Sequence, residues 1–305
     1  MTVTQSDNLP QGRLHDALTS YLSESLLHND APKRTIAIES LVDEFPDSAL
    51  QYDDRGRLPI HVACEEGLPL GVIQCLLQTW PDTIESPTKR KRQMIPLHVV
   101  CRHYNGSNCQ KSAVIQHMLT INPWAARTTT AAGETPLHCL LQNYFCTLAD
   151  VKLLVNVYPE ALDIATKKGY TPLHIACEMH YMERSTKRAR PTDDNPSSSS
   201  ADIIAFLLKH VSPEALGATN SKGELPLHSA VRSHQSLDTI RGLLSAYPDA
   251  SKRVDRRGRT ALHLATARHS LCRKTVRYLI QANQSAVHQK DNDGSTPRIL
   301  DARQL

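Results

Sequence analysis

The stretch Gly169-Tyr170-Thr171-Pro172-Leu173-His174-Ile175-Ala176-Cys177 decides the fold, because its central Thr-Pro-Leu-His or a close variant returns along the chain. Six copies keep the histidine, and Thr296-Pro297-Arg298-Ile299 is a seventh, degraded copy. The six repeat histidines are His61, His98, His138, His174, His228 and His263. They are separated by 37, 40, 36, 54 and 35 residues, so the chain is built from repeats of about 35 residues.

A second marker is a proline that recurs once in each repeat, as in Tyr158-Pro159 and Tyr247-Pro248. This proline stands 15 residues before the next repeat histidine in five cases of six, and 17 residues before it between Pro81 and His98. Two apolar runs with helical spacing, such as 173–177 and 151–155, lie between successive markers. Proline is tolerated in the first turn of a helix, and the residue before it is pushed out of the α region. Each repeat is therefore predicted to be a helix, a turn, a second helix and an extended loop.

This arrangement resembles the ankyrin repeat, whose signature T-P-L-H-x-A lies within about 33 residues. Proline stands where the common pattern has glycine, as in a variant with Y-P-x-A in place of G-A-D. The residue five positions before each repeat histidine, or before Ile299, matches the family's hairpin-finger glycine at Gly56, Gly133, Gly169, Gly223, Gly258 and Gly294, with Gln93 as the one departure. The resemblance implies an all-α ankyrin-repeat solenoid of about six helix-turn-helix units with hairpin fingers, plus partial caps.

The repeat boundaries predict the domain organisation. Residues 1–12 are expected to be a disordered N-terminus and 13–305 an ankyrin-repeat array. Within the array we expect an N-terminal cap at 13–52, repeat units at 53–290 and a partial C-terminal unit at 291–305. A disordered insert is expected at 181–200. The insert lies in the 54-residue step, has no apolar periodicity and ends in four serines, which are potential phosphorylation sites.

Composition narrows the class of protein. The 305 residues are 40% hydrophobic and 5% aromatic, with 3 Phe, so we expect thin aliphatic layers that neighbouring repeats close. No secretory signal and no membrane-length apolar stretch is found in the sequence, which predicts a cytoplasmic and/or nuclear protein without a membrane contact. The eight cysteines are then expected to be reduced, and the protein to be a monomer.

The residues that could carry chemistry have structural interpretations. Resemblance to the ankyrin repeat implies that each repeat histidine hydrogen-bonds to a threonine three positions before it and to the adjacent loop. Cys64, Cys101 and Cys177 stand where that family has a small buried alanine. The spacings of Cys101, His103 and Cys109 do not match structural zinc sites, and no nucleotide-binding or hydrolase motif occurs. We therefore predict no enzymatic activity, no metal and no cofactor.

Charge at the exposed positions of the repeats predicts the function. In ankyrin-like arrays, partners bind the fingers and the exposed end of the first helix, which together form a concave surface. The 33 matching positions hold 13 basic and 7 acidic residues, a net charge of +6, whereas the whole chain is +4. The predicted partner-binding residues are Arg55, Arg57, Lys91, Arg92, Arg102, Lys167, Lys168, Tyr170, Lys222, Arg232, Arg256, Arg257, Arg259 and Arg268. This pattern predicts a protein-interaction scaffold for an acidic protein surface or peptide.

Two other interpretations remain open at this stage. The basic residues can simply keep exposed loops soluble, or they can meet nucleic acid in a nuclear regulatory protein. Tyr170 is the only aromatic residue among the 33 positions, which disfavours nucleic acid because base stacking needs aromatic rings. The runs 89–92 and 187–191 resemble nuclear-import signals, the second through Lys187, Arg188 and Arg190. Neither the partner's identity nor the pathway follows from such a sequence.

Overall fold

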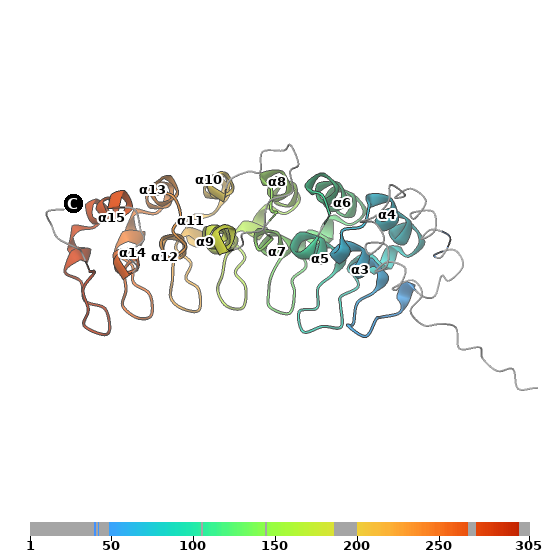
Figure 1. The fold of residues 1–305 in the computed structure, drawn as a ribbon, viewed down its shortest axis with the longest axis horizontal. Coiled ribbons are helices and arrows are strands. Elements are labelled where there is room, and N and C mark those ends of the chain that lie inside the picture. The colour runs from blue at the N-terminus through green and yellow to red at the C-terminus, as the bar shows by residue number, and fades with distance from the viewer. Residues whose placement is uncertain are drawn as a thin grey trace, which may run out of the picture. The chain divides into compact units, whose positions relative to one another are not determined.

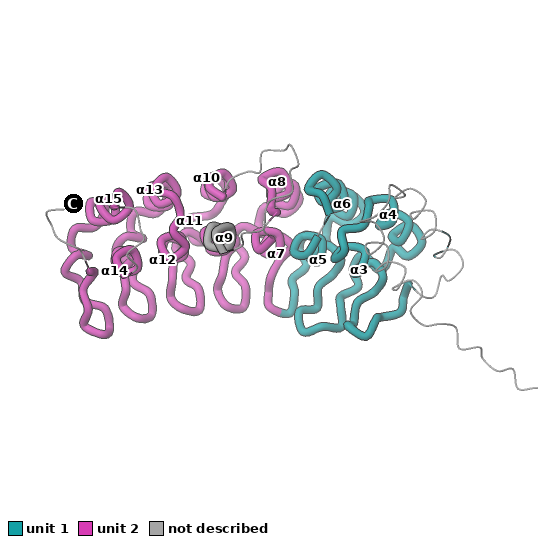
Figure 2. The backbone as a smooth tube through the Cα atoms, viewed as in Figure 1, with its two compact units in different colours: residues 1–131 teal, residues 132–305 magenta. Residues whose placement is uncertain are grey.

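The computed structural model describes residues 40, 42, 49–104, 106–143, 145–185, 200–267 and 273–298. The predicted disordered N-terminus, most of the predicted N-terminal cap, the import cluster Lys187, Arg188 and Arg190, and Arg268 lie outside these ranges. The chain divides into two compact units, residues 1–131 (unit 1) and 132–305 (unit 2), shown in Figure 2. The sequence predicted a single array, and the division falls inside the loop that contains Gly133.

The described residues of unit 1 form two helix pairs, each followed by a short 3₁₀ turn. Its elements are α3 (Pro59–Glu66), α4 (Leu70–Thr79), η2 (Pro81–Glu85), α5 (Pro96–His103), α6 (Asn108–Ile121) and η3 (Pro123–Arg127). The first helices of the two pairs, α3 and α5, pack on each other, and so do the second helices, α4 and α6. These two repeats of unit 1 therefore bury their apolar faces against each other, as the sequence predicted.

The part of unit 2 that the structure describes contains four helix pairs on the same plan. Its elements are α7 (Pro136–Leu141), α8 (Leu148–Val157), η4 (Pro159–Leu162), α9 (Pro172–Ser185), α10 (Ser200–His210), α11 (Pro213–Leu216), α12 (Pro226–Arg232), α13 (Leu237–Ala246), η5 (Pro248–Ser251), α14 (Ala261–Ala267), α15 (Arg273–Ala282) and η6 (Gln284–Val287). In this unit, Figure 1 shows α7, α9, α12 and α14 in one row and α8, α10, α13 and α15 in a second. No strand occurs in the described ranges, which confirms the all-α helix-turn-helix repeat.

Proline marks the start of two elements in most repeats. It is the first residue of α3, α5, α7, α9 and α12, where its missing N–H has no intrahelical partner. The second helix ends before the residue–proline pair, as predicted: α8 ends at Val157, just before Tyr158-Pro159. A 3₁₀ turn, here Pro159–Leu162, stands between the second helix and the extended loop that the sequence predicted. The fixed φ of proline suits the first position of such a turn.

Both ends of the segment predicted to be a disordered insert, residues 181–200, are helical. Helix α9 continues to Ser185, so 181–185 are helical, and Ser200 is the first residue of α10. Residues 181–185 read Tyr-Met-Glu-Arg-Ser and contain no proline or glycine, so nothing in them ends the helix that Pro172 starts. Residues 186–199 lie outside the described ranges.

The core is aliphatic. Buried apolar side chains in the described ranges are leucine, isoleucine, valine, alanine, methionine and cysteine, with Tyr104 as the single buried aromatic residue of that set. The hydroxyl of Tyr104 donates to the carbonyl oxygen of Leu68 at 3.1 Å, which satisfies its polar end. Cys64, Cys101 and Cys177 have no exposed surface, and burial raises the pKa of the Cys64 and Cys177 thiols. Such thiols act as small packing groups.

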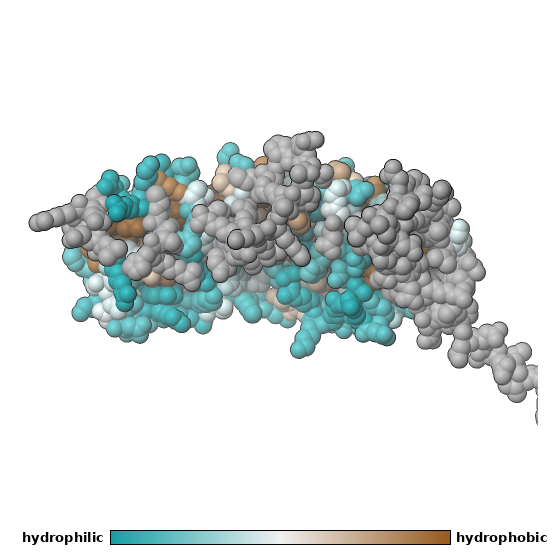
Figure 3. All heavy atoms as spheres, viewed as in Figure 1, coloured by the Kyte–Doolittle hydropathy of each residue, from teal (hydrophilic) through white to brown (hydrophobic). Residues whose placement is uncertain are grey.

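In the described residues, seven hairpin loops precede the first helices of the repeats or the degraded last copy, and we name them fingers. In chain order, fingers 1 to 7 are residues 53–57, 88–94, 130–134, 166–170, 220–224, 255–259 and 291–295. Fingers 1 and 2 belong to unit 1, fingers 4 to 7 belong to unit 2, and finger 3 contains the division between them. Within each unit the fingers extend to one side (Figure 1), and Figure 3 shows that this edge is mostly hydrophilic.

Candidate functional site

Each finger outside the divided finger 3 is closed by hydrogen bonds between its two ends. In finger 4 the backbone N–H of Thr166 donates to the carbonyl of Tyr170 at 2.9 Å, and the N–H of Tyr170 donates to Oγ1 of Thr166 at 3.1 Å. Asp255 plays the same part in finger 6, where its Oδ1 accepts from the N–H groups of Arg257 and Arg259. A side-chain oxygen that satisfies loop N–H groups fixes the shape of the finger.

Neighbouring fingers are also joined to one another through the backbone. In unit 2 the N–H of Ser221 donates to the carbonyl of Lys168 at 2.7 Å, and the N–H of Arg256 donates to that of Lys222 at 3.0 Å. Finger 7 is joined in the same way, from Asn292 to the carbonyl of Arg257 at 2.9 Å. The side chains at the finger tips therefore start from backbones that are held in place.

Finger 2 differs from the other fingers in length. Its closing bond, from the N–H of Thr88 to the carbonyl of Met94 at 2.9 Å, spans six positions, whereas the equivalent bond in finger 4 spans four. Gln93 occupies the position that is glycine elsewhere and has a φ of 51°, in the left-handed region that glycine favours. The spacing of 17 residues between Pro81 and His98 thus corresponds to two extra residues in this finger.

Four repeat histidines connect a first helix to the following finger. Nδ1 of His138 lies 2.8 Å from Oγ1 of Thr135, and its Nε2 lies 3.1 Å from the carbonyl oxygen of Tyr170. His174, His228 and His263 bond in the same way through Nε2 to the following finger, at 2.9, 3.2 and 3.2 Å. Burial lowers the pKa of His138 and of His174 to about 4, so both rings are neutral at pH 7. These histidines hold the repeat together.

His61 makes the Nδ1 hydrogen bond within its own turn but no Nε2 hydrogen bond to the following finger. Its Nδ1 accepts from the N–H of Leu58 at 3.1 Å, but its buried Nε2 has no hydrogen-bond partner among the described residues, although the longer finger 2 follows it. Burial lowers the pKa of His61 to about 4, and the nearby backbone of Ser86 and Met94 offsets this only in part. The neutral ring therefore carries its proton on Nε2, without an acceptor in hydrogen-bond geometry.

Two of the predicted partner-binding arginines each pair with an aspartate of their own finger, and Arg57 also pairs with a glutamate of α3. Nε of Arg57 lies 2.8 Å from Oδ2 of Asp53, its Nη1 lies 2.9 Å from Oε2 of Glu65, and the residue is 5% exposed. Arg259 pairs with Asp255 through Nη2 at 2.6 Å. Burial alone would raise the pKa of Asp255, but hydrogen bonds from Arg259 and the finger backbone hold it below its ordinary value. The charges of these two arginines are balanced internally.

Arg232, a third predicted partner-binding residue, lies between two carboxylates. Its Nη2 contacts Oε1 of Glu178 and lies 3.1 Å from Oε2 of the buried Glu224. Burial raises the pKa of Glu178, and the charge of Arg232 opposes that rise. Tyr170 is half-buried beside this group, with its ring edge-on to His174 at 5.9 Å between centroids.

The 33 positions of the sequence analysis included Glu65 but left out Asp53 and Asp255, the aspartates that pair with Arg57 and Arg259. Asp53 and Asp255 stand three residues before the finger glycine and four before the arginine, and only the other finger positions entered the count. The Asp-x-x-Gly-Arg spacing would have predicted both ion pairs. The longer-range contact between Arg232 and Glu178 had no local signal.

A group of five basic residues in unit 2 remains at the finger tips. All five are exposed, and the described part of the chain supplies no ion pair to their side chains. We call them the unit 2 finger cations: Lys167, Lys168, Lys222, Arg256 and Arg257. They occupy three consecutive fingers, whereas finger 7 carries Asn292 and Asp293 at its tip.

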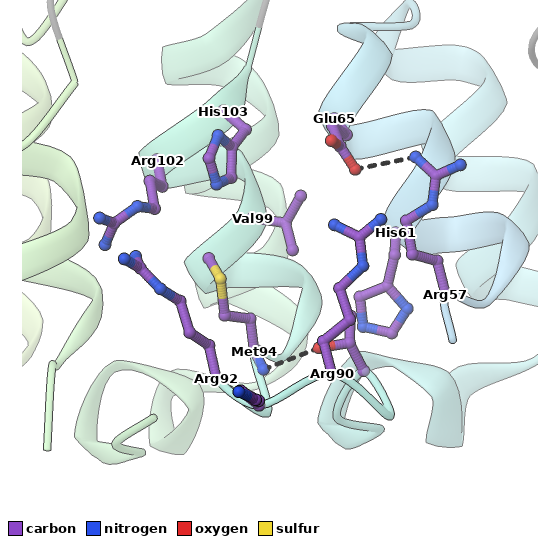
Figure 4. Close-up of a pocket in the computed structure, with 11 residues that line it drawn as sticks. Arg57, His61, Glu65, Arg90, Arg92, Met94, Val99, Arg102 and His103 are labelled. Atoms are coloured by element: carbon purple, nitrogen blue, oxygen red, sulfur yellow. Dashed lines mark hydrogen bonds and ion pairs between the residues drawn. The ribbon is translucent and has the colours of Figure 1, made fainter. Parts of the chain in front are cut away.

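A pocket of about 410 Å³ lies in unit 1 between finger 2 and the helices α3 and α5. Figure 4 shows Arg90 and Arg92 rising from finger 2, and Arg102 entering from the end of α5 on the same side as Arg92. Lys91 also lines the pocket. Met94 and Val99, which are 6% and 4% exposed, form its apolar part. We call this space the finger 2 pocket.

The electrostatics of the finger 2 pocket are strongly positive. Five basic side chains line it against one carboxylate, Glu65, which bonds to Arg57. His103 at its rim keeps an exposed edge, yet burial of its ring and then the charge of Arg102 lower its pKa, with Glu65 opposing. Nε of Arg90 donates to the carbonyl of Arg55 at 2.8 Å, which fixes one arm of the pocket to finger 1.

Other kinds of site find little support in the described residues. No group of three or more histidine, cysteine, aspartate or glutamate side chains within them could hold a metal ion. None of the helices in those ranges is both long and apolar enough to cross a membrane.

Comparison with known proteins relates the repeats to one family. The family model for the ankyrin repeat matches residues 257–292. Neurogenic locus notch homolog protein 2 from Homo sapiens is 31% identical over 146 residues, which cover 47% of this chain. Neurogenic locus notch homolog protein 1 from Danio rerio is 33% identical over 136 residues, or 44% of the chain. The matched parts span only 6% and 5% of these relatives.

A solved structure shows the same fold over most of the chain. The human ASB11 ankyrin repeat domain superposes with a TM-score of 0.59, covering 89% of this chain and 97% of that one. The two sequences are 18% identical. This likeness supports the repeat architecture that the helices, the fingers and the repeat histidines define.

Proposed function

Since the chain is an ankyrin-repeat protein, we propose that it is a protein-interaction scaffold that binds an acidic segment of a partner across the unit 2 finger cations. Ankyrin repeats generally serve to bind other proteins, and this much applies to the family as a whole. The acidic character of the partner is our inference from the charges of this chain.

The observation that supports this proposal is the contrast between paired and unpaired basic residues. Arg232 and Arg259 are balanced by internal carboxylates, whereas the five finger cations have no ion pair within the described residues. Exposed charges of one sign on fixed backbones accelerate the encounter with an oppositely charged surface and favour it over others. Charges that served solubility alone would not need three consecutive fingers joined by backbone bonds.

Nucleic acid fits this surface less well than an acidic protein. Binding of single strands depends on aromatic rings that stack on bases. Tyr170, the one aromatic residue at the predicted positions, is half-buried against His174 and beside Arg232. Binding therefore depends on charge alone at these finger tips, which an extended acidic peptide satisfies.

A charge-reversal experiment with a matched control tests the proposal. Wild-type protein is compared with K168E/K222E/R257E on the finger tips and with K152E/K209E/K274E on α8, α10 and α15, which changes the net charge equally. Binding of a fluorescent peptide of alternating glutamate and glycine is measured by anisotropy at several salt concentrations. We expect the finger variant to weaken binding at least about tenfold and to flatten its salt dependence, and the helix variant to do neither. Equal effects of the two variants would contradict the proposal.

The location of the protein in the cell follows as a further part of the proposal. We infer that it acts in the cytoplasm or the nucleus, as a monomer and without catalysis. A fluorescent fusion that lacks residues 184–191 tests nuclear import by the basic cluster. An unchanged nuclear signal would rule out a role for that cluster.

A further inference from the structure

We propose that the finger 2 pocket binds the phosphate of a phosphorylated serine or threonine in the partner, which deepens the proposed function and rests on it. The unit 2 finger cations form an exposed surface that suits acidic side chains in general. The finger 2 pocket instead surrounds one position with basic groups from two repeats.

The first argument is charge. Arg90, Lys91, Arg92 and Arg102 line the pocket in addition to Arg57, which pairs with Glu65. A carboxylate brings one negative charge, whereas a phosphate monoester brings about −1.5 to −2 at pH 7 and three acceptor oxygens. The pocket's excess of positive charge therefore suits a phosphate better than a glutamate.

The second argument is the type of donor. Arg92 and Arg102 enter from different elements and end on the same side of the pocket (Figure 4). Guanidinium groups can offer paired N–H donors to phosphate oxygens, an arrangement stronger and more specific than a point charge. Whatever internal contacts these two side chains have, a bound phosphate would draw on donors that a guanidinium has in excess.

The third argument is the origin of the pocket. The two extra residues of finger 2 lengthen its loop, and Nε2 of His61, which lines the pocket and has no exposed surface, is left without a partner in the described part of the chain. In the shorter fingers the equivalent nitrogen bonds to the finger backbone. The longer loop carries Arg90, Lys91 and Arg92, and all three line the pocket beside α3.

Size and lining distinguish a phosphopeptide from other phosphate carriers. A volume of about 410 Å³ exceeds what a phosphate ion alone requires and falls in the range of pockets that hold larger ligands. Met94 and Val99 can contact the aliphatic part of a phosphoserine or phosphothreonine. No phenylalanine, tyrosine or tryptophan occurs among the described residues that line the pocket, so a nucleotide base finds no aromatic ring there to stack on.

Binding to the full chain is tested with three peptide pools that have identical degenerate acidic flanks and differ only at the central residue: phosphoserine, glutamate or serine. We expect the phosphoserine pool to bind at least about tenfold more tightly than the glutamate pool. The R92Q/R102Q variant should lose this preference, and R92K/R102K, which keeps the charge but not the paired donors, should retain part of it. Circular dichroism of each variant confirms that it is folded.

A variant of the other surface separates the two proposals. K168Q/K222Q in unit 2 should weaken all three pools and leave the phosphoserine preference unchanged. Equal binding of the phosphoserine and glutamate pools, or a preference that survives in R92Q/R102Q, would overturn the pocket proposal while the finger surface stands. A preference that depends on Arg92 and Arg102 with no effect of K168Q/K222Q would support the pocket and contradict the finger surface.

A spectroscopic measurement reports on the pocket itself. Because the surrounding arginines disfavour protonation of His103, a bound dianion should raise the pKa of its ring, as followed by NMR during a pH titration. Saturating phosphoserine pool should shift the midpoint upwards in wild type and not in R92Q/R102Q. Binding to phosphoinositide-containing vesicles without binding to the phosphoserine pool would assign the pocket to a lipid headgroup and overturn the proposal.

Discussion

Finger 2 of unit 1 and finger 4 of unit 2 have similar composition and different form. Each begins with a threonine whose hydroxyl accepts, at 3.1 Å, a hydrogen bond from the backbone N–H of the last residue of that finger. Both fingers also carry adjacent basic residues. Finger 4 has two residues before its glycine, contacts His138 through the carbonyl of Tyr170, and presents its lysines as an exposed tip. Finger 2 has two more residues, leaves Nε2 of His61 without an acceptor in the described ranges, and borders a pocket. The number of residues in the loop, rather than the kind of charge, separates the two surfaces.

The largest expected effect is the loss of folding stability at low pH. We expect the repeat histidine of unit 1, His61, and that of unit 2, His138, to contribute to it equally. His61 and His138 both have a pKa of about 4, below the ordinary 6.5, and His174 is similar. The unfolded chain therefore binds more protons between pH 6.5 and 4, and the stability contributed above pH 6.5 is lost as the pH falls. Each histidine should cost about 2 kcal/mol between about pH 7 and about pH 5, so that the three together cost about 6 kcal/mol.

Urea unfolding at several pH values checks this expectation. His61→Gln and His138→Gln should each flatten the pH dependence by the same amount, because burial and not the Nε2 contact lowers both pKa values. The same substitution at His288, which is exposed, provides the control for the change of side chain itself. An undiminished pH slope in the variant that carries both substitutions would mean that groups other than His61 and His138 cause the transition.

A smaller effect is expected from exchanging the residue at the left-handed position. Gly169 has a φ of 75°, and a Cβ there would lie 2.7 Å from the carbonyl oxygen of Thr219, so Gly169→Gln should cost about 3 kcal/mol. Gln93→Gly in finger 2 should instead gain up to about 1 kcal/mol by relieving the strain at its φ of 51°. Both changes are measured as the free energy of unfolding in urea.

Gly294→Gln is the control for this pair, because Gly294 has a similar φ of 76° and a Cβ there would have no atom of the described residues within 4 Å. Its cost isolates the backbone strain, about 1 kcal/mol. If Gly169→Gln costs no more than Gly294→Gln, the close contact between fingers 4 and 5 does not contribute to stability.

The smallest expected effect is the difference between two alanine substitutions. His138→Ala removes a bond to the next finger that His61 does not make, whereas burial and the bond within the turn are comparable. His138→Ala should therefore destabilise the protein by about 1 kcal/mol more than His61→Ala. A larger loss for His61→Ala would show that its Nε2 is satisfied in solution.

Much of the fold was predictable because the repeat carries its own local signals. Proline at the start of Pro172–Ser185, the threonine three positions before His174, and the glycine at Gly169 each act within one turn or one loop. The continuation of α9 to Ser185 was missed, because the sequence there lacks hydrophobic periodicity even though nothing in it stops a helix.

The candidate site was predictable only in outline. Exposed charge at Lys168 or Arg257 follows from its position in the repeat, but the neutralisation of Arg57 by Glu65 and of Arg232 by Glu178 depends on contacts between elements. The sequence showed two extra residues before His98 without showing that they form one side of a pocket. Pockets arise where two repeats meet, and a repeat pattern describes one repeat at a time.

Shortening finger 2 tests most directly whether loop length creates the pocket. Residues 90–91 are deleted, which leaves two residues, Lys89 and Arg92, before Gln93 and removes two positive charges. R90Q/K91Q removes two charges at full length and serves as the control. We predict that the ratio of phosphoserine-pool to glutamate-pool affinity falls to about 1 in the shortened finger and stays well above that value in R90Q/K91Q. An undiminished ratio in the shortened finger would contradict the account.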